Sequence, residues 1–205
     1  MLLQTIFYVA LTAEAMTAAL AAGRRSMDWF GVCVLACVTA LGGGTVRDIV
    51  LGHYPLIWVE NPYLLVLCCV AAFITIFLAR HVSAMRWPFL MLDAIGLVTF
   101  TIIGCNVALE MGQQPIIVVV AGLITGVAGG VLRDVLCARV PLVFSSELYA
   151  TVAIVSGVLY YFGHISPLPH DLVLIGVIGV GFALRVFAIV FKQEIPKFVY
   201  DEDPR

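Results

Sequence analysis

Seven charged residues lie inside long apolar stretches of the sequence, and these are the side chains that could do chemistry. They are Glu14, Arg47, Asp48, Asp93, Arg133, Asp134 and Arg185. A charged group near the centre of a bilayer costs about 2.5–3.5 kcal/mol or more, so such residues normally face the interior of a helix bundle and have partners. They are typical of ion or substrate pathways, although paired charges can also serve only to fix helix packing.

Four of these charges belong to a motif that occurs twice. Residues 41–63 read LGGGTVRDIVLGHYPLIWVENPY, and residues 127–149, 86 positions further on, read VAGGVLRDVLCARVPLVFSSELY. The shared Gly-Gly-x-x-Arg-Asp gives the pairs Gly43/Gly129, Gly44/Gly130, Arg47/Arg133 and Asp48/Asp134. If three membrane spans separate equivalent positions, the two copies cross the membrane in opposite directions. Inverted repeats of this kind commonly enclose the substrate path between them.

The glycines of the two motifs, Gly42–Gly44 and Gly129–Gly130, lie near the middle of their apolar stretches. Glycine permits kinks, and an opened backbone at membrane depth is tolerated only where it faces protein or a water-filled cavity. The alternative is that glycines at four-residue spacing simply let helices pack closely. A triplet in one copy and a pair in the other favour a functional break at both places.

The elements that must position these residues are membrane-spanning helices. Hydrophobic residues make up 62% of the sequence and charged residues only 12%, whereas a soluble domain carries about 25% charged residues. Apolar runs long enough to span a bilayer predict seven helices, at residues 2–22, 30–52, 63–79, 89–109, 115–137, 147–163 and 172–191. We therefore expect an all-α membrane protein with two inverted three-helix repeats, residues 1–88 and 89–165, followed by a seventh helix and short tail in residues 166–205.

The cationic residues are expected on one side of the membrane. Eight of the eleven Lys and Arg residues follow the first, third, fifth and seventh spans: Arg24, Arg25, Arg80, Arg86, Arg139, Lys192, Lys197 and Arg205. The loops after the second, fourth and sixth spans contain none. The positive-inside rule then places the N-terminus outside and the C-terminus in the cytoplasm. No basic patch suggests a nucleic-acid partner.

The depth of each charge predicts its partner. Arg133 and Asp93 fall at the same inner level, with Arg185 on the same side, so we expect these three to cluster. Arg47 lies about 9 Å toward the outside, counted at 1.5 Å per residue, and the repeat equivalent of Asp93 is Phe7, so Arg47 lacks that carboxylate. Adjacent residues on a helix do not face each other, so we expect Arg47 and Asp48 to bond elsewhere.

Glu14 lies near the middle of the first span, where its repeat equivalent is Phe100. It could be a proton-coupling group, a cation ligand or a protonated packing residue, and the sequence leaves these three roles open. The six cysteines and four histidines show no metal-ligand spacing. No nucleophile elbow, P-loop or zincin motif is present, so we expect no metal, no cofactor and no enzyme activity.

The doubled motif resembles the paired glycine-rich motifs of the bacterial trimeric intracellular cation (TRIC) channel family. GGGTVRDIVLG with the downstream Pro55, AGGVLRDVL with the downstream Pro141, and LDAIGLVTFTIIG at 92–104 fit that pattern. The resemblance covers about residues 10–190. It departs from the pattern at Ala128, which stands where the first motif has Gly42, and at Glu14, a position that is more often apolar.

The resemblance implies a homotrimer in a bacterial inner membrane, in which each subunit has an hourglass-shaped pore for monovalent cations such as K⁺. It also implies that the glycines kink the second and fifth spans, with the two Arg-Asp pairs beside the pore. Some bacterial members of this family are instead described as glycine transporters.

Two functions therefore compete. In a K⁺ channel, carbonyls freed at the breaks replace part of the hydration shell of the ion. In a carrier of glycine or another small amino acid, half-helix N-termini hold a carboxylate while the repeats rock around it. Four intramembrane carboxylates against three arginines do not separate a cation from a zwitterion. The channel is the leading expectation, and a scaffold without transport ranks last because it would need no buried charges.

Overall fold

The structure, a computed structural model, describes residues 2–79, 86–145 and 148–191, and its regular secondary structure in these ranges is entirely helical. Seven helices are long: α1 (Leu2–Gly23), α2 (Trp29–Leu51), α4 (Tyr63–Ala79), α5 (Arg86–Glu110), α6 (Pro115–Leu136), α8 (Tyr149–Ile165) and α9 (His170–Phe191). Two single-turn helices, α3 (Ile57–Glu60) and α7 (Leu142–Ser145), follow α2 and α6.

The seven expected spans are confirmed, with boundaries that differ by at most three residues. Five of the long helices have the length and hydropathy of membrane spans. The other two, α4 and α8, have 17 residues each, which gives about 26 Å at 1.5 Å per residue. Some of the cationic residues in the expectations lie outside the described ranges, as does position 147, where the sixth span was expected to begin: Arg80, Lys192, Lys197 and Arg205.

Local sequence signals explain where the two motif-bearing helices begin and end. Asp28 caps the start of α2, because its carboxylate accepts a hydrogen bond from the backbone N–H of Gly31 at 2.7 Å. Gly52 ends α2 in the left-handed conformation, with φ of 68°, which costs glycine little. Pro115 occupies the first turn of α6, where a missing N–H does no harm.

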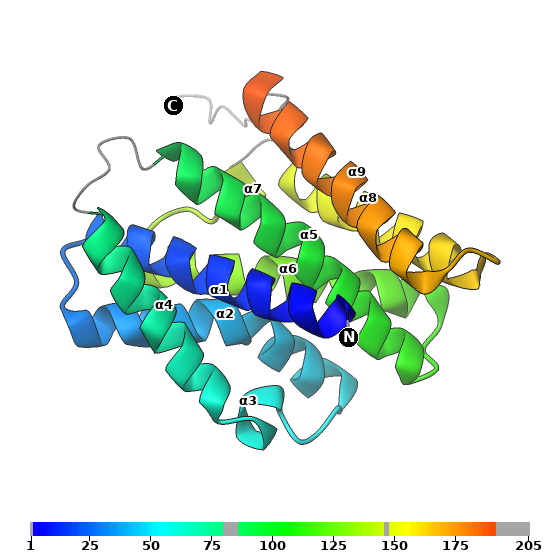
Figure 1. Ribbon diagram of the computed structural model, residues 1–205, viewed down its shortest axis with the longest axis horizontal. Coiled ribbons are helices and arrows are strands. Elements are labelled where there is room, and N and C mark those ends of the chain that lie inside the picture. The colour runs from blue at the N-terminus through cyan, green and yellow to red at the C-terminus, as the bar shows by residue number, and fades with distance from the viewer. Residues whose placement is uncertain (1, 80–85, 146–147, 192–205) are drawn as a thin grey trace, which may run out of the picture.

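The long helices form two groups that correspond to the two repeats. Side chains of α1, α2 and α4 supply most of one buried core, and side chains of α5, α6, α8 and α9 supply the other. Figure 1 shows α2 and α6 running in opposite directions, one from each group, with α9 lying over α8 at one side of the bundle. The expected inverted arrangement of three plus three helices and one additional helix is therefore present.

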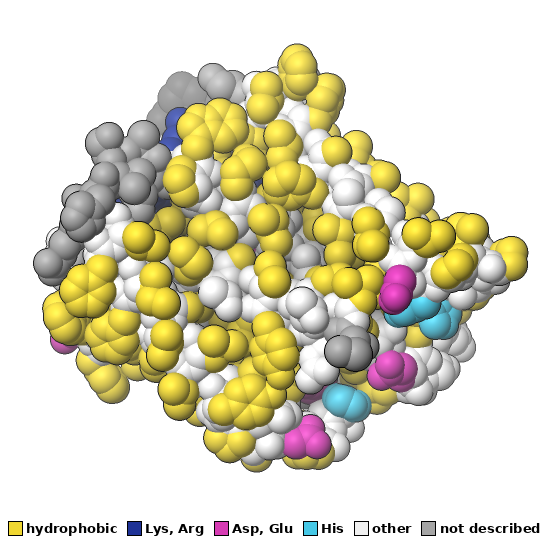
Figure 2. All heavy atoms as spheres, viewed as in Figure 1, with side chains coloured by type: hydrophobic (Ala, Val, Ile, Leu, Met, Phe, Trp, Pro, Cys, Tyr) yellow, Lys and Arg dark blue, Asp and Glu magenta, His cyan; other side chains and the backbone are white. Residues whose placement is uncertain are grey.

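The outer surface of the bundle is apolar, as a protein surrounded by lipid requires. Large hydrophobic side chains on every long helix are exposed, for example Phe30 and Ile116, which are 78% and 76% exposed. Figure 2 shows hydrophobic side chains over most of one face, with Lys and Arg visible at the upper left and most of the visible Asp, Glu and His toward the lower right.

Candidate functional site

The two glycine motifs meet where α2 crosses α6. A Cβ atom built on Gly43 would press against the backbone carbonyl of Thr125, and one built on Gly129 would press against the carbonyl of Thr39. Thr39 and Thr125 are equivalent in the repeat, as are the two glycines. The contact is therefore the same on both sides of a pseudo-two-fold axis, and it brings the two helix backbones together near the middle of each helix.

These glycines do not open the backbone, which corrects the expected functional break. Both α2 and α6 are assigned as helix without interruption through Gly42–Gly44 and Gly129–Gly130. The physical reason is that a close helix crossing needs a residue without a side chain but does not need a broken hydrogen-bond ladder. Gly43 and Gly129 supply this crossing, while Gly44 lies beside the guanidinium of Arg47 and Gly130 beside that of Arg133.

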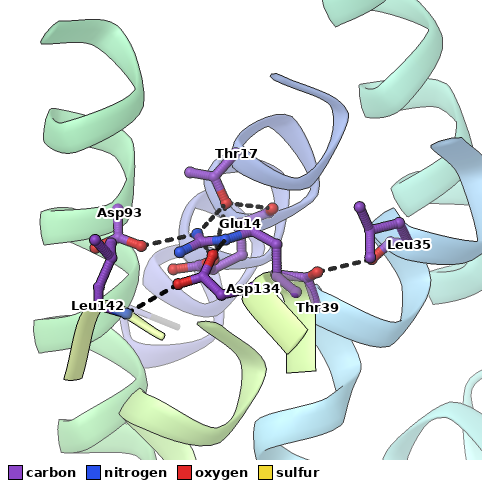
Figure 3. Close-up of polar contacts among 8 residues, drawn as sticks. Glu14, Thr17, Leu35, Thr39, Asp93, Asp134 and Leu142 are labelled. Carbon is purple, nitrogen blue, oxygen red and sulfur yellow. Dashed lines mark hydrogen bonds and ion pairs between the residues drawn. The ribbon is translucent and has the colours of Figure 1, made fainter. Parts of the chain in front are cut away.

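A buried cluster of charges lies between α1, α5 and α6. Arg133 is fully buried, and its Nη1 donates hydrogen bonds to Asp93 Oδ1 at 2.8 Å and to Thr17 Oγ1 at 3.0 Å. The same nitrogen lies 3.8 Å from Glu14 Oε2. Figure 3 shows the side chains of Glu14, Thr17, Asp93 and Asp134 converging from the three helices. The ion pair between Arg133 and Asp93 that their depth predicted is confirmed.

Each motif arginine binds the aspartate next to it in sequence, which makes the opposite expectation wrong. Arg47 donates from Nε and Nη2 to Asp48 Oδ1 at 2.9 and 2.7 Å, and Arg133 donates from Nε to Asp134 Oδ1 at 2.9 Å. The rule for adjacent helical residues describes where side chains leave the backbone, whereas an arginine is long enough to turn back. Both carboxylates also receive a bond from the segment after the helix, His53 Nδ1 at 3.1 Å and Leu142 N at 3.0 Å.

Aromatic rings extend the cluster on two sides. The guanidinium of Arg185 lies 4.6 Å from the centroid of the Tyr149 ring. The Tyr149 hydroxyl and Arg133 Nη2 both border Gly130, and the expected grouping of Arg185 with Arg133 and Asp93 stays a prediction. Phe89 lies between two cations, with Arg133 at 4.7 Å and Arg24 at 5.2 Å from its centroid. Partial burial and the nearby Arg139, Arg133 and Arg86 charges lower the pKa of Arg24. Phe89 thus separates the buried cluster from the cationic end of the bundle.

Glu14 is held in place by a glycine of the neighbouring helix. Its carboxylate occupies the space that a Cβ atom on Gly96 would fill. The Thr17 hydroxyl lies 3.0 Å from Glu14 Oε2 and 2.8 Å from the Glu14 carbonyl oxygen. Glu14 is 3% exposed. The geometry therefore makes Glu14 part of the Arg133 cluster, and it does not by itself choose among the three roles considered above.

The other end of the α2–α6 pair is less enclosed. Arg47 lines a cavity of about 290 Å³, together with Gln113 and apolar residues of α2 and α6. The positions that hold Glu14 and Asp93 near Arg133 are occupied by Phe100 and Phe7 in the opposite repeat, and these two rings lie 6.3 Å apart. The two arginines of the repeat therefore lie in different electrostatic surroundings. The sequence had already predicted that Arg47 lacks an equivalent of Asp93.

Comparison with known proteins supports the duplicated organisation. A family model described as "Glycine transporter" matches the chain twice, over residues 4–80 and 90–164. The chain belongs to this Glycine transporter family. It is also similar to UPF0126 inner membrane protein YadS of Escherichia coli (strain K12), with 39% identity over all of both chains. UPF0126 membrane protein YvgT of Bacillus subtilis is 32% identical over 92% of each chain.

The chain is also similar in structure to TRIC channels. The chain matches the TRIC trimeric intracellular cation channel orthologue from Rhodobacter sphaeroides with a TM-score of 0.88 and 33% identity. The match covers 94% of this chain and 99% of that one. The resemblance to bacterial TRIC proteins that the doubled motif indicated is therefore confirmed at the level of the whole fold.

Sequence reasoning did not identify four residues of the Arg133 cluster and its surroundings: Thr17, Phe89, Gly96 and Tyr149. Thr17 follows Glu14 by three residues and so shares its helix face, which is a signal that was available. Tyr149 also carried a signal, since it is the repeat equivalent of Tyr63. Phe89 and Gly96 lie in an apolar helix with many similar neighbours, and only their contacts distinguish them.

Proposed function

We propose that the protein conducts monovalent cations, K⁺ among them, along a pathway between α2 and α6 within each subunit. The observation that carries the proposal is the agreement in fold, at 33% identity and over almost the whole of both chains, with a protein described as a cation channel. The paired helices that meet at the centre of this fold also carry four of the seven intramembrane charges.

The charge cluster supports a role in holding a cation. Glu14, Asp93 and Asp134 contribute three carboxylates against the two guanidinium groups of Arg133 and Arg185, a formal charge of −1 when all are ionised. A charge in surroundings of low dielectric constant attracts an ion more strongly than in water. Because both helices are unbroken, carboxylate and threonine oxygens would replace the hydration shell, in place of the freed carbonyls expected from the sequence.

The pathway is closed at the helix crossing in this conformation. The backbones of α2 and α6 touch through Gly43 and Gly129, so an ion that passes between them requires the two helices to separate there. Phe89 covers the cluster on the side of Arg24. Opening of the pathway would therefore need a movement at the helix crossing and a displacement of the Phe89 ring. A channel that opens in this way is gated.

Transport of glycine or another small amino acid is the alternative, and one feature of the cluster favours it. Within the described residues, Arg133 Nη2 and Asp93 Oδ2 are both buried and have no hydrogen-bond partner. A zwitterion could offer a carboxylate to the first and an ammonium group to the second. The description of the family as a glycine transporter points the same way.

Membrane placement and assembly complete the proposal. We infer that the N-terminus faces outside and the C-terminus the cytoplasm, since eight of the eleven cationic residues follow alternate spans along the sequence. We also infer that three copies assemble, because the similar Rhodobacter protein is described as trimeric. Residues 1–88 and 89–165 would act as the two moving halves, and residues 166–205 would carry the added helix. The similarity to an inner membrane protein of E. coli supports a bacterial inner membrane location.

Flux into proteoliposomes tests both functions. A K⁺ current under a voltage step that is unaffected by glycine supports the channel, whereas saturable glycine uptake without K⁺ current supports the carrier. Arg133→Gln should alter either activity, since it removes the central cation of the cluster. Arg86→Gln is the matched control, because Arg86 is exposed at the same end of the bundle. Full K⁺ and glycine flux in Arg133→Gln would contradict a pathway through the cluster.

A further inference from the structure

A cavity beside Arg47 lies between α2 and α6, at the opposite end of this helix pair from the Arg133 cluster. It has a volume of about 290 Å³ and is lined by six apolar residues and two polar ones, Arg47 and Gln113. Among its apolar residues, Val50, Ile117 and Val120 are exposed on the surface of the subunit, at 64%, 38% and 41%. The cavity therefore reaches the apolar outer surface of the subunit.

The polar end of this cavity favours an anion. Arg47 is only 4% exposed, and its Nε and Nη2 atoms bind Asp48. Its Nη1 makes no hydrogen bond to the part of the chain that the structure describes. Because each terminal guanidinium nitrogen carries two N–H donors, at least these two donors remain for a ligand. The charged or titratable groups recorded in contact with Arg47 and Asp48 are each other and His53.

The start of α6 adds to this preference. Gln113 and Ile117, on either side of the helix start at Pro115, both line the cavity. The first turn of a helix presents backbone N–H groups without partners and the positive end of the helix dipole. A buried arginine and a helix N-terminus thus face one space, and both attract negatively charged oxygens.

Comparison of the two repeats shows that this arrangement is particular to one end. Arg133, the equivalent of Arg47, has three carboxylates within 4 Å, from Glu14, Asp93 and Asp134. Arg47 has one, because Phe100 and Phe7 replace the other two. The protein supplies the additional anionic partners itself at one end, and it leaves an arginine with space for an external anion at the other.

An apolar groove lies beside this cavity. It has a volume of about 440 Å³, it is lined by side chains of α6 and α8, and Val120 lines both spaces. Its other walls include Ile116, Leu123, Ile154 and Phe162. A free inorganic anion gains nothing from such a groove, whereas an acyl chain can pack along its apolar walls.

We propose that Arg47, Gln113 and the start of α6 bind the phosphodiester of an anionic phospholipid, with one acyl chain in the groove between α6 and α8. The lipid comes from the leaflet at the end of the bundle where α2 ends, which is the outer leaflet in the proposed orientation. The site lies at the Arg47 end of the α2–α6 pair, and its binding test does not depend on which species is transported.

Native mass spectrometry of the purified full-length protein tests the site. Phosphatidylglycerol and phosphatidylcholine with identical chains are titrated separately, and we expect preferential retention of phosphatidylglycerol. Arg47→Gln should weaken this binding by about tenfold or more, equivalent to about 1.4 kcal/mol, while Arg47→Lys should keep most of it because the charge remains. Elution volume and thermal unfolding establish that each variant is folded.

A second variant leaves the ion pair of Arg47 and Asp48 untouched. Ile117→Trp places a large ring in the cavity and should reduce phosphatidylglycerol binding. Val135→Trp is its control, because Val135 is 58% exposed near the opposite end of α6 and lines neither space. We expect binding in Val135→Trp to equal that of the wild type.

Four results would overturn the lipid site. Equal retention of the two phospholipids would show that the protein does not recognise the anionic headgroup. Unchanged phosphatidylglycerol binding in both Arg47→Gln and Ile117→Trp would show that the lipid does not bind at this cavity. Displacement of phosphatidylglycerol by an equal concentration of glycerol phosphate would show a site for free phosphate esters, with no part for the acyl chain. A change of oligomeric state in Ile117→Trp with lipid binding intact would show that a second copy of the chain covers this face.

Discussion

The crossing of α2 and α6 makes a sharp prediction about adjacent glycines. Replacing Gly43 by alanine places a Cβ atom against the carbonyl group of Thr125, with the carbonyl carbon at 3.1 Å and the N atom of Gly129 at 3.5 Å. These are backbone atoms, which cannot rotate away. Replacing Gly44 places a Cβ atom 3.8 Å from Arg47 Nη2, which is ordinary contact. One substitution should disturb the crossing, and its neighbour should not.

The magnitude follows from comparing the two variants. Alanine in a helix interior is favoured over glycine by about 0.5–1 kcal/mol, and this gain is shared by both positions. It therefore cancels in the difference, which leaves the cost of overpacking at Gly43, about 1–3 kcal/mol. We expect Gly44→Ala to be as stable as the wild type or slightly more so, and Gly43→Ala to be less stable than Gly44→Ala by that difference.

The repeat supplies an independent second pair. A Cβ atom on Gly129 would press against the Thr39 carbonyl, whereas one on Gly130 would lie 3.4 Å from the Tyr149 hydroxyl, a side-chain group that can adjust. The same order is therefore expected, with Gly129→Ala less stable than Gly130→Ala. Agreement between the two pairs would tie the effect to the symmetric crossing and not to either helix alone.

Reversible unfolding in detergent measures these differences, and K⁺ flux in proteoliposomes records their functional effect. Because Gly43→Ala holds the two helices apart at the closed crossing, its basal K⁺ flux should exceed that of Gly44→Ala per folded protein. Equal unfolding free energies for Gly43→Ala and Gly44→Ala would refute the close-packing account. Equal flux with unequal stability would show that the crossing packs the bundle without closing the pathway.

Three further predictions concern the buried cluster. Arg133→Gln leaves the neighbouring carboxylates without their central cation and should lower the unfolding free energy by about 3–5 kcal/mol. Arg86→Gln, at an exposed position, should change it by no more than about 0.5 kcal/mol. Similar thermal shifts for the two variants would contradict the cluster. Gly96→Ala displaces the Glu14 carboxylate and should destabilise the protein. In a double-mutant cycle, the added variant Glu14→Ala should recover part of that loss. Additive effects of the two substitutions would mean that the two residues do not interact. Phe89→Ala removes the ring over the cluster and should raise K⁺ flux; unchanged flux would show that the ring is no barrier.

Much of the architecture could be predicted because it depends on properties that are local along the chain. A run of about 20 apolar residues has few stable alternatives to a membrane-spanning helix, since every backbone group in lipid must be satisfied internally. The 86-residue repeat, read with three intervening spans, then fixed α2 and α6 as antiparallel partners. Depth along straight helices was also sufficient to pair Arg133 with Asp93, because both positions are measured from the same membrane.

The rotation of each helix about its axis and the reach of its long side chains could not be predicted in this way. The angle at which each helix turns about its axis decides which glycine enters a crossing, and neighbouring glycines such as Gly43 and Gly44 are equivalent in any count along the sequence. The length of an arginine side chain allowed Arg47 to bind Asp48, although their starting directions diverge. Both outcomes depend on distances of a few ångströms across the bundle.

The sequence by itself thus determined the number of spans, their alternation and the doubling of the charged helix, because hydropathy and repetition act along the chain. The tertiary structure decided that the central glycines join two helices without breaking them, that Glu14 rests on Gly96, and that one of two equivalent arginines is enclosed while the other borders a lipid-facing cavity. Those features arise from contacts between residues far apart in sequence, and only the packed bundle brings them within reach.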